Sequence, residues 1–354
     1  MSKRIIALLL ALVMVFALCA CGNGGNGGNS AGDEDVGDET YTIRIACENS
    51  DSYPATLGLY QMEKYVESHT NGKVQVEVCA SGQLGGEEET LEQVAQGNLE
   101  MAVASFAPVV SYVPEFEVMD IPFVYNSYTE AWMVLDSYVG TNLLDKMEAQ
   151  GLKGMAYMEN GMRQVTSNVS AINSIADFKG VKLRTMQNNN HMASFSALGA
   201  NPTPVAFSEL YISLSQKVVD AQENPIANVT DKKLYEVQKY LSLTNHIYDA
   251  MPLVCNLEFF NSLPQAYQKV VQAGAIYAQE FSRFCNLERE DLILADLADK
   301  YGMQINEVSA DARAEMAKVA QPAVIKLVAK DIGQDAVDQY MNDVKDVLAQ
   351  ISKF

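Results

Sequence analysis

The stretch VVDAQENP, from Val218 to Pro225, passes from two β-branched residues to a run of hydrogen-bonding side chains and then to a proline. Valines favour a strand, and a proline suits the first turn of a helix. Ligands of open α/β sheets bind beyond the carboxyl ends of the strands. We therefore expect Gln222, Glu223 and Asn224 to leave a strand and face a cleft. The alternative is that Glu223 and Asn224 only cap the following helix.

The same alternation of strand and helix patterns surrounds this stretch. Short apolar or alternating runs predict strands at 41–47, 74–78, 101–104, 153–158, 163–167, 181–184 and 218–222. Helical spacing predicts helices from Pro54 to about residue 70, near residue 87, at 189–198 and at 207–214. Because strands and helices alternate, we expect parallel pairing with right-handed crossovers, and the fold class is α/β.

The C-terminal part of the chain is predicted to be helical. One long helix is expected after Pro264 and before Gly302, with an apolar face made of Val270, Gly274, Tyr277, Phe281 and Phe284. Pro322 should kink or break the segment that follows, because proline cannot donate the helical hydrogen bond. A second apolar stripe at 337–351 predicts a final helix. No linker divides residues 41–354, so two lobes would require the chain to cross between them more than once.

The N-terminal residues indicate export from the cytoplasm. Basic residues precede the apolar run IIALLLALVMVFAL, which is short for a transmembrane span and typical of a signal peptide. Cys21 follows a small residue, as in a bacterial lipobox, so residues 1–21 are interpreted as a lipoprotein signal and Cys21 as the lipidated residue. Ordinary secretion with release is the alternative. Residues 22–40 are rich in Gly, Asn and acids and are interpreted as a flexible tether.

Composition excludes several classes of function. The formal net charge of −20 argues against nucleic acid as a partner, and a bound anion would need a local cluster of cations. The histidines are isolated from one another, so no metal site or cofactor is expected.

Cys47 and Cys79 each end a predicted strand. They are either buried free thiols, the simpler reading, or a disulfide that an extracytoplasmic compartment would allow.

Polar side chains at the predicted strand ends are the candidate site. They are Glu48, Glu87, Ser105, Arg163, Arg184 and Asn224. Structural alternatives remain for three of them: a surface charge on an edge strand for Arg184, an ion pair with Glu159 for Arg163, and stabilisation of a helix dipole for Glu87. The sequence contains no G-x-S-x-G motif and no zinc-binding helix, which argues against an enzyme.

Residues 161–186, GMRQVTSNVSAINSIADFKGVKLRTM, closely resemble the solute-binding proteins of TRAP transporters of the DctP type. The likeness continues through LGANPTPVAFSELYISLSQKVVDAQENPIANV at 198–229, and SGQLGGEEETLEQVAQGNLEMA at 81–102 is similar to the first lobe of these proteins. It extends from Tyr41 to the C-terminus. The resemblance implies a two-lobed, periplasmic-binding-protein-like receptor with a long helix that spans both lobes, a helical C-terminus, and delivery of organic acids to a membrane permease.

The resemblance also implies roles for individual residues. The arginine of the family's K-G-x-K-x-R segment, which grips the ligand carboxylate, corresponds to Arg184. A second arginine corresponds to Arg163, the asparagine of Q-E-N-P to Asn224, and an aromatic residue of the site to Phe207. The opening stretch would then be a wall of the ligand site.

The expected class of ligand follows from positions in the first lobe where this sequence differs from the sialic-acid receptors of the family. The second lobe is most similar to sialic-acid receptors, but those place an acidic residue where Ser105 stands and an asparagine where Glu48 stands. Glu48 and Glu87 would repel a second carboxylate and accept hydrogen bonds from hydroxyls. We therefore expect a sugar acid such as a uronate or aldonate. A C4-dicarboxylate or sialic acid, a sensory lipoprotein, and a sugar-acid lyase with Glu87 or His191 as base are the alternatives.

The predicted organisation of the chain combines these interpretations. Lobe 1 comprises residues 41–160 with a return near 248–262, and lobe 2 comprises residues 161–247. The spanning helix and the C-terminal helices occupy residues 263–354. The expected partners are a small carboxylate, the permease subunits, and the cell membrane through the lipid on Cys21.

Overall fold

A computed structural model describes residues 39–351. The signal peptide, the lipidation predicted at Cys21 and nearly all of the tether lie outside the described residues. Within residues 39–351, no helix combines the length and the apolar character needed to cross a bilayer.

Strands and helices alternate through the first two thirds of the described chain. The strands are β1 (Tyr41–Ala46), β2 (Val74–Cys79), β3 (Met101–Val103), β4 (Leu152–Ser167), β5 (Lys182–Thr185), β6 (Asn201–Pro204), β7 (Ala221–Pro225), β8 (Tyr240–Leu243), β9 (Tyr248–Asn256) and β10 (Gln304–Glu307). The helices are α2 (Pro54–His69), α3 (Glu87–Ala95), α4 (Phe106–Val109), α5 (Tyr128–Leu135), α6 (Tyr138–Asp145), α7 (Asn189–Ala197), α8 (Leu210–Ser215), α9 (Ile226–Asp231), α10 (Leu257–Ser262), α11 (Gln265–Asp299), α12 (Ala310–Ile332) and α13 (Gln334–Ile351). Short 3-10 helices are η1 (Pro114–Asp120), η2 (Lys146–Gln150), η3 (Ile175–Phe178), η4 (Phe207–Glu209) and η5 (Leu234–Glu236).

The sheet is mixed, and its parallel parts lie where strands alternate with helices. The strand order is β2-β1-β3-β9-β4-β7-β5-β6, with β8 also paired to β4 and β10 paired to β8. Strand β1 pairs in parallel with β2 and β3, as predicted, and β5 pairs in parallel with β6 and β7. Strands β4 and β9 are antiparallel to each other, because β4 leads from the first part of the sheet to the second and β9 leads back.

Strand β4 joins the two parts of the sheet. The two strands predicted at 153–158 and 163–167 are one strand of 16 residues. Its residues 152–162 pair with β9, and its residues 163–167 pair with β7 and β8. The architecture is thus two-lobed, with one lobe around β1, β2, β3 and β9 and the other around β5 to β8. The lobe boundary between residues 160 and 161 stays a prediction; it falls within a register shift between Glu159 and Gly161.

The stretch VVDAQENP forms its strand later than predicted. Val218 is 55 % exposed, and β7 runs from Ala221 to Pro225, so Gln222, Glu223 and Asn224 lie within the strand. The expectation of a strand exit at these residues was wrong. The alternative that Glu223 and Asn224 cap the following helix was also wrong. The N-cap of α9 is Pro225, and no side chain donates or accepts a capping hydrogen bond there. Strand β7 pairs with β4 on one side and β5 on the other, and its buried side chains bond to their neighbours: Asn224 donates to Gln222, and Gln222 donates to Thr166 of β4.

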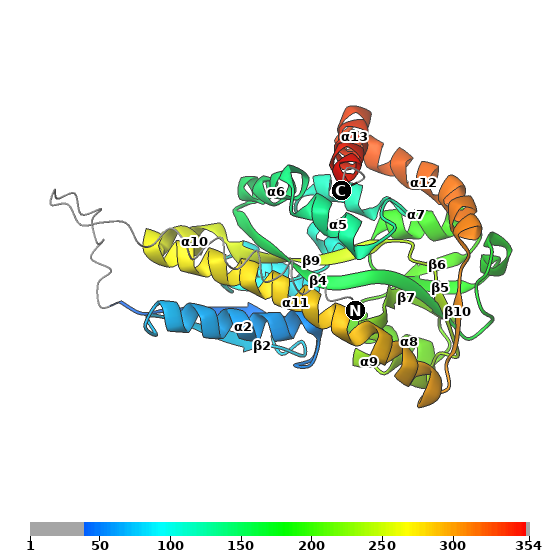
Figure 1. Cartoon of the computed structure of the whole chain (residues 1–354), viewed down its shortest axis with the longest axis horizontal. Helices are drawn as coiled ribbons and strands as arrows, with labels where there is room; N and C mark the ends of the chain where they lie inside the picture. The colour runs from blue at the N-terminus through cyan, green and yellow to red at the C-terminus, as the bar shows by residue number, and fades with distance from the viewer. Residues whose placement is uncertain (1–38, 352–354) are drawn as a thin grey trace. The chain divides into compact units, whose positions relative to one another are not determined.

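Helix α11 is the long helix that the resemblance implied. It contains 35 residues and lies beside α2 at one end and α9 at the other (Figure 1). Its predicted apolar face was wrong, since Tyr277 and Phe284 are exposed. Small residues form the buried face instead, because α2 approaches closely: a Cβ on Gly58 of α2 would lie 2.5 Å from the carbonyl oxygen of Ala278.

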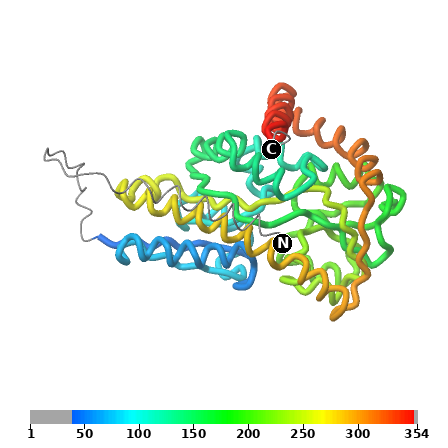
Figure 2. Tube along the Cα trace, in the orientation of Figure 1, coloured from blue at the N-terminus to red at the C-terminus, as the bar shows by residue number. Residues whose placement is uncertain are grey.

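The C-terminal helices connect the two cores. Helix α12 places Met316 in the core beside β5 and Val324 in the core beside β3 and β9, and α13 adds Val337 and Val344 to the second of these. Pro322 lies inside α12, which runs on to Ile332, so of the two predicted outcomes the break is excluded and the kink stays a prediction. The chain path in Figure 2 shows α12 passing along both lobes before α13.

Candidate functional site

A cavity of about 250 Å³ lies between the two parts of the sheet. Its walls come from the end of β1, the start of α3, α4, the end of β5 and residues 205–208. Four predicted site residues line it: Glu48, Glu87, Arg184 and Phe207. Drug-sized ligands occupy pockets of roughly 300–1,000 Å³, so this cavity suits a smaller molecule.

Arg184 is the cation of this cavity. Strand β5 lies between β7 and β6, so Arg184 is 1 % exposed and the edge-strand alternative is wrong. Its Nε donates to the carbonyl oxygen of Val205 at 2.8 Å, whereas Nη1 is buried without a hydrogen-bond partner in the described part of the chain. Burial lowers the pKa of the guanidinium to about 10, which still leaves it charged at neutral pH. A buried charge without a partner is costly, so the site favours an anion.

Two carboxylates face the same cavity. Glu87 stands at the first position of α3 and accepts hydrogen bonds from the backbone nitrogen (3.0 Å) and the Oγ (2.6 Å) of Ser105. Glu48 Oε2 accepts from the backbone nitrogen of Glu87 at 3.2 Å, and Glu48 Oε1 has no partner among residues 39–351. Burial, followed by the charge of Glu48, raises the pKa of Glu87 to about 7. Burial also raises the pKa of Glu48, although Lys232 and Arg184 oppose it.

Ser105 and Phe207 support this pair from opposite lobes. Ser105 does not line the cavity, and its part is to hold both oxygens of Glu87. Phe207, in η4, lines the cavity. The Nζ of Lys232 lies over the face of its ring, 4.6 Å from the ring centroid. The ring thus offers an apolar surface opposite the two carboxylates.

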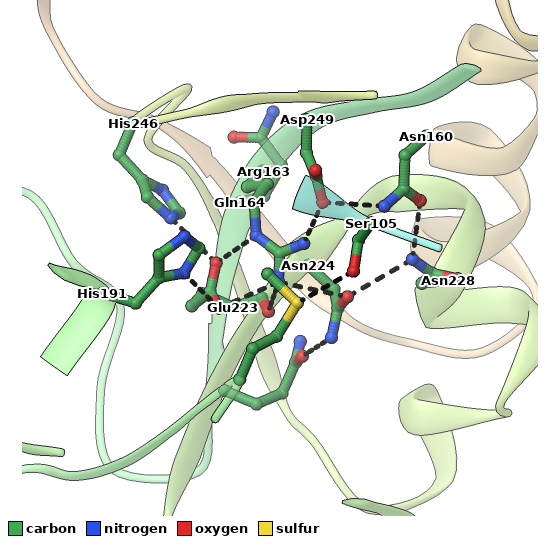
Figure 3. Close-up of polar contacts among 12 residues, drawn as sticks. Ser105, Asn160, Arg163, Gln164, His191, Glu223, Asn224, Asn228, His246 and Asp249 are labelled. Atoms are coloured by element: carbon green, nitrogen blue, oxygen red, sulfur yellow. Dashed lines mark hydrogen bonds and ion pairs between the residues drawn. The ribbon is translucent and has the colours of Figure 1, made fainter. Parts of the chain in front are cut away.

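Arg163 and Asn224 lie in a separate buried cluster rather than on the cavity wall (Figure 3). Arg163 forms a bidentate pair with Glu223 and donates from Nη1 to Asp249 at 2.7 Å. Asn224 Oδ1 accepts from Arg163 Nη2 at 3.3 Å. The alternative pairing of Arg163 with Glu159 is wrong. Burial alone would lower the pKa of Arg163, but Glu223 and Asp249 reverse this and raise it.

Two histidines complete the cluster around Glu223. His246 Nε2 lies 3.1 Å from Glu223, and His191 contacts Glu223 at 3.7 Å and Asp120 at 3.2 Å. Although burial lowers the pKa of His191, its hydrogen bond to Asp120 and the nearby carboxylate of Glu223 raise it to about 9. A histidine ring held between two carboxylates is poorly suited to act as the base of a lyase.

Sequence reasoning did not find Asp120, Asp249 or His246. Asp120 lies more than a hundred residues before the other two, and no spacing connects any of them to Arg163 or Glu223. Cys47 and Cys79 are buried free thiols, in agreement with the simpler of the two readings. Across residues 39–351 there is no group of three or more His, Cys, Asp and Glu side chains that could hold a metal ion.

Comparison with known proteins agrees with this geometry. The family described as bacterial extracellular solute-binding protein, family 7 (DctP), matches residues 45–331. The C4-dicarboxylate-binding periplasmic protein DctP of Rhodobacter capsulatus is 31 % identical over 84 % of this chain and 90 % of its own. The likeness of the second lobe to sialic-acid receptors stays a prediction.

Two solved structures resemble the whole described fold. The sugar acid binding protein DctPAm of Advenella mimigardefordensis, in complex with galactonate, has a TM-score of 0.83 and 32 % identity, covering 87 % of this chain and 99 % of its own. A TRAP periplasmic solute binding protein of Polaromonas sp. JS666, bound to D-erythronate, has a TM-score of 0.80 and 34 % identity, covering 85 % of this chain and 98 % of its own. The chain therefore belongs to the DctP family of extracytoplasmic solute-binding proteins, the solute receptors of TRAP transporters, and is not an enzyme.

Proposed function

We propose that the protein captures a small polyhydroxy monocarboxylic acid, an aldonate or a uronate, and delivers it to a TRAP permease. The observation that carries this proposal is the buried Nη1 of Arg184, which has no partner within residues 39–351 and belongs to a cavity-lining side chain. A guanidinium offers parallel N–H groups to a carboxylate, and each charged hydrogen bond contributes about 1.5–3 kcal/mol. The ligand carboxylate would bind there and remove the cost of the unpaired charge.

The presence of Glu48 and Glu87 in the cavity indicates that the rest of the ligand carries hydroxyl groups. Glu48 Oε1 lacks a partner in the described structure and can accept from a hydroxyl. A second ligand carboxylate would instead meet four cavity-lining glutamates, Glu48 and those at 87–89, with a single arginine among the lining residues. Because such like charges repel strongly in a dry site, a C4-dicarboxylate is the second candidate.

The similar proteins support the same ranking of ligand classes, with polyhydroxy monoacids before C4-dicarboxylates. Galactonate and D-erythronate, which the two solved structures hold, are both polyhydroxy monoacids. The Rhodobacter capsulatus relative binds C4-dicarboxylates, which keeps that class as the alternative.

The remaining site residues are assigned roles around this ligand. Phe207 would cover the C–H face of the acid, and Ser105 would orient Glu87. Glu223 is the acid whose charge acts most strongly on Arg184. We assign Arg163 and Asn224 to holding Glu223 in place, so that they act on the ligand through Arg184.

The protein acts outside the cytoplasm, as its family does. We infer that Cys21 carries a lipid and that residues 22–40 tether the receptor near the permease. The basic and apolar leader followed by a small residue and Cys21 supports this inference. Cys21→Ser should move the protein from the membrane fraction to the soluble fraction, and a membrane-bound variant would contradict the anchor.

Isothermal titration calorimetry of residues 39–354 against D-galactonate, D-erythronate, D-glucuronate, succinate and N-acetylneuraminate tests the proposed ligand class. We expect binding of sugar acids that Arg184→Lys weakens at least tenfold, because lysine cannot offer two parallel donors. Arg44→Lys, at a partly buried ion pair with Glu100 outside the cavity, is the matched control. Binding of succinate or N-acetylneuraminate alone would overturn the ligand class, and an unchanged affinity in Arg184→Lys would overturn the role of Arg184.

A further inference from the structure

Three consecutive residues that follow β1 contact three residues at the end of α9. Asn49 Nδ2 donates to Asn228 Oδ1 at 3.0 Å. The backbone nitrogen of Ser50 donates to Asp231 Oδ1 at 3.3 Å, and its hydroxyl donates to the same carboxylate. We call residues 48–50 and 228–232 together the seam. Since its two sides come from opposite lobes, the seam forms only when the lobes are together.

Lys232 is the member of the seam that also reaches the ligand cavity. Its Nζ donates to the carbonyl oxygen of Glu48 at 3.3 Å, and the same Nζ lies 4.6 Å from the ring centroid of Phe207. Glu48 belongs to the first lobe and Phe207 to the second, and both line the cavity. The ammonium group of Lys232 therefore contacts one cavity-lining residue of each lobe, although Lys232 does not line the cavity.

We propose that Lys232 is a positioning residue that couples closure of the seam to the shape and charge of the ligand cavity. This inference rests on the proposed function for the identity of the ligand but not for the existence of the seam. When the seam closes, the ammonium group takes its place beside Glu48 and over Phe207. The carboxylate that reads ligand hydroxyls and the ring that covers the ligand are then held together.

The chemistry of the two contacts explains why a cation stands here. A carbonyl oxygen accepts a charged hydrogen bond, and the face of an aromatic ring attracts a cation most when water is excluded. The positive charge beside Glu48 also keeps this buried carboxylate able to accept from a hydroxyl. Arginine could make the same two contacts, whereas methionine fills the same volume without either.

Three variants separate positioning from simple loss of charge. Lys232→Met removes both contacts, and Lys232→Arg retains them. Lys233→Met removes the same charge at the next, exposed residue and is the matched control. Native-state hydrogen exchange of the Ser50 amide reports closure of the seam without any ligand, and the Cys47 amide, which donates to Cys79 within the first lobe, is the internal reference.

We expect the Ser50 amide to be protected in the wild type, less protected by about tenfold in Lys232→Met, and restored in Lys232→Arg. Exchange at Cys47 should not change. The affinity for D-galactonate should fall by a similar factor in Lys232→Met and remain within about threefold of the wild type in Lys232→Arg and Lys233→Met. An unprotected Ser50 amide in the wild type, equal protection in Lys232→Met, or failure of arginine to rescue would each overturn the proposal. If no sugar acid binds, the proposed ligand class fails, and exchange at Ser50 still decides the role of Lys232.

Discussion

Replacing Glu87 by glutamine should stabilise the ligand-free protein, and the gain should increase with pH. The two oxygens of Glu87 accept hydrogen bonds from the backbone and the hydroxyl of Ser105. A glutamine can keep both contacts, because its carbonyl accepts from the backbone nitrogen and the hydroxyl can turn to accept from its NH₂ group. The variant therefore removes a charge from the cavity with little change in packing.

The magnitude follows from the raised pKa of Glu87. Burial and the charge of Glu48 raise this pKa from 4.5 to about 7. A group with a raised pKa in the folded state stabilises the fold fully below its unfolded pKa, and this contribution is lost as pH rises through the folded pKa. One pKa unit corresponds to about 1.36 kcal/mol, so ionisation of Glu87 costs at most about 3 kcal/mol at pH 8 and under about 1 kcal/mol at pH 5. Solvent reaches part of this side chain, which lowers both figures.

Thermal unfolding of the two proteins at pH 5 and pH 8 measures this difference. The advantage of Glu87→Gln should grow by about 2 kcal/mol between the two pH values, or about 4 °C in the unfolding midpoint. Glu92→Gln removes a charge from an exposed position of the same helix, outside the cavity lining, and is the matched control. A difference between Glu87→Gln and wild type that stays constant or shrinks as pH rises would refute the reasoning.

Further predictions concern the cavity, the charge cluster and the helix contact. Arg184→Ala should weaken sugar-acid binding by about 3 kcal/mol in calorimetry, because the ligand carboxylate loses its partner in a dry site. Arg163→Met should lower the free energy of unfolding by about 3–5 kcal/mol, since it leaves buried carboxylates unpaired; a change below 1 kcal/mol would contradict the cluster. Gly58→Val should lower the midpoint of thermal unfolding by several degrees, because its Cβ would lie 2.5 Å from the backbone carbonyl oxygen of Ala278. The stability that His191 contributes should be present below pH 6.5 and lost as pH rises through about 9, and comparison with His191→Gln across this range measures it.

Local patterns were sufficient for most elements of the first lobe. Alternating residues predicted β1 and β2 to within one residue, and Pro54 and the helical spacing predicted both ends of α2, because these signals depend on neighbours in the chain. The same reasoning misplaced β7, since a strand buried on both sides by pairing can hold polar residues that satisfy one another. It also chose the wrong face of α11, because the close approach of α2 favours small residues over large apolar ones.

For the candidate site, too, the sequence predicted the residue types but not their contacts in space. The types of residue at strand ends, and the resemblance that they carried, were enough to select Glu48, Glu87, Arg184 and Phe207, which share one cavity. The spacing of residues could not reveal that Arg163 is neutralised by Glu223 and Asp249 whereas Arg184 keeps an unpaired nitrogen.

By itself the sequence determined the family, the α/β class and the chemical types at the cavity, because each depends on residue identity and short-range order. Only the tertiary structure decided which buried charges are already paired and which remain for a ligand. Long-range folding brings Asp249 to Arg163 and Lys232 to Glu48, and no local pattern contains those distances. In a low-dielectric interior, the free energy of a charge depends on the few groups within a few ångströms, so the role of each arginine follows from its neighbours in space.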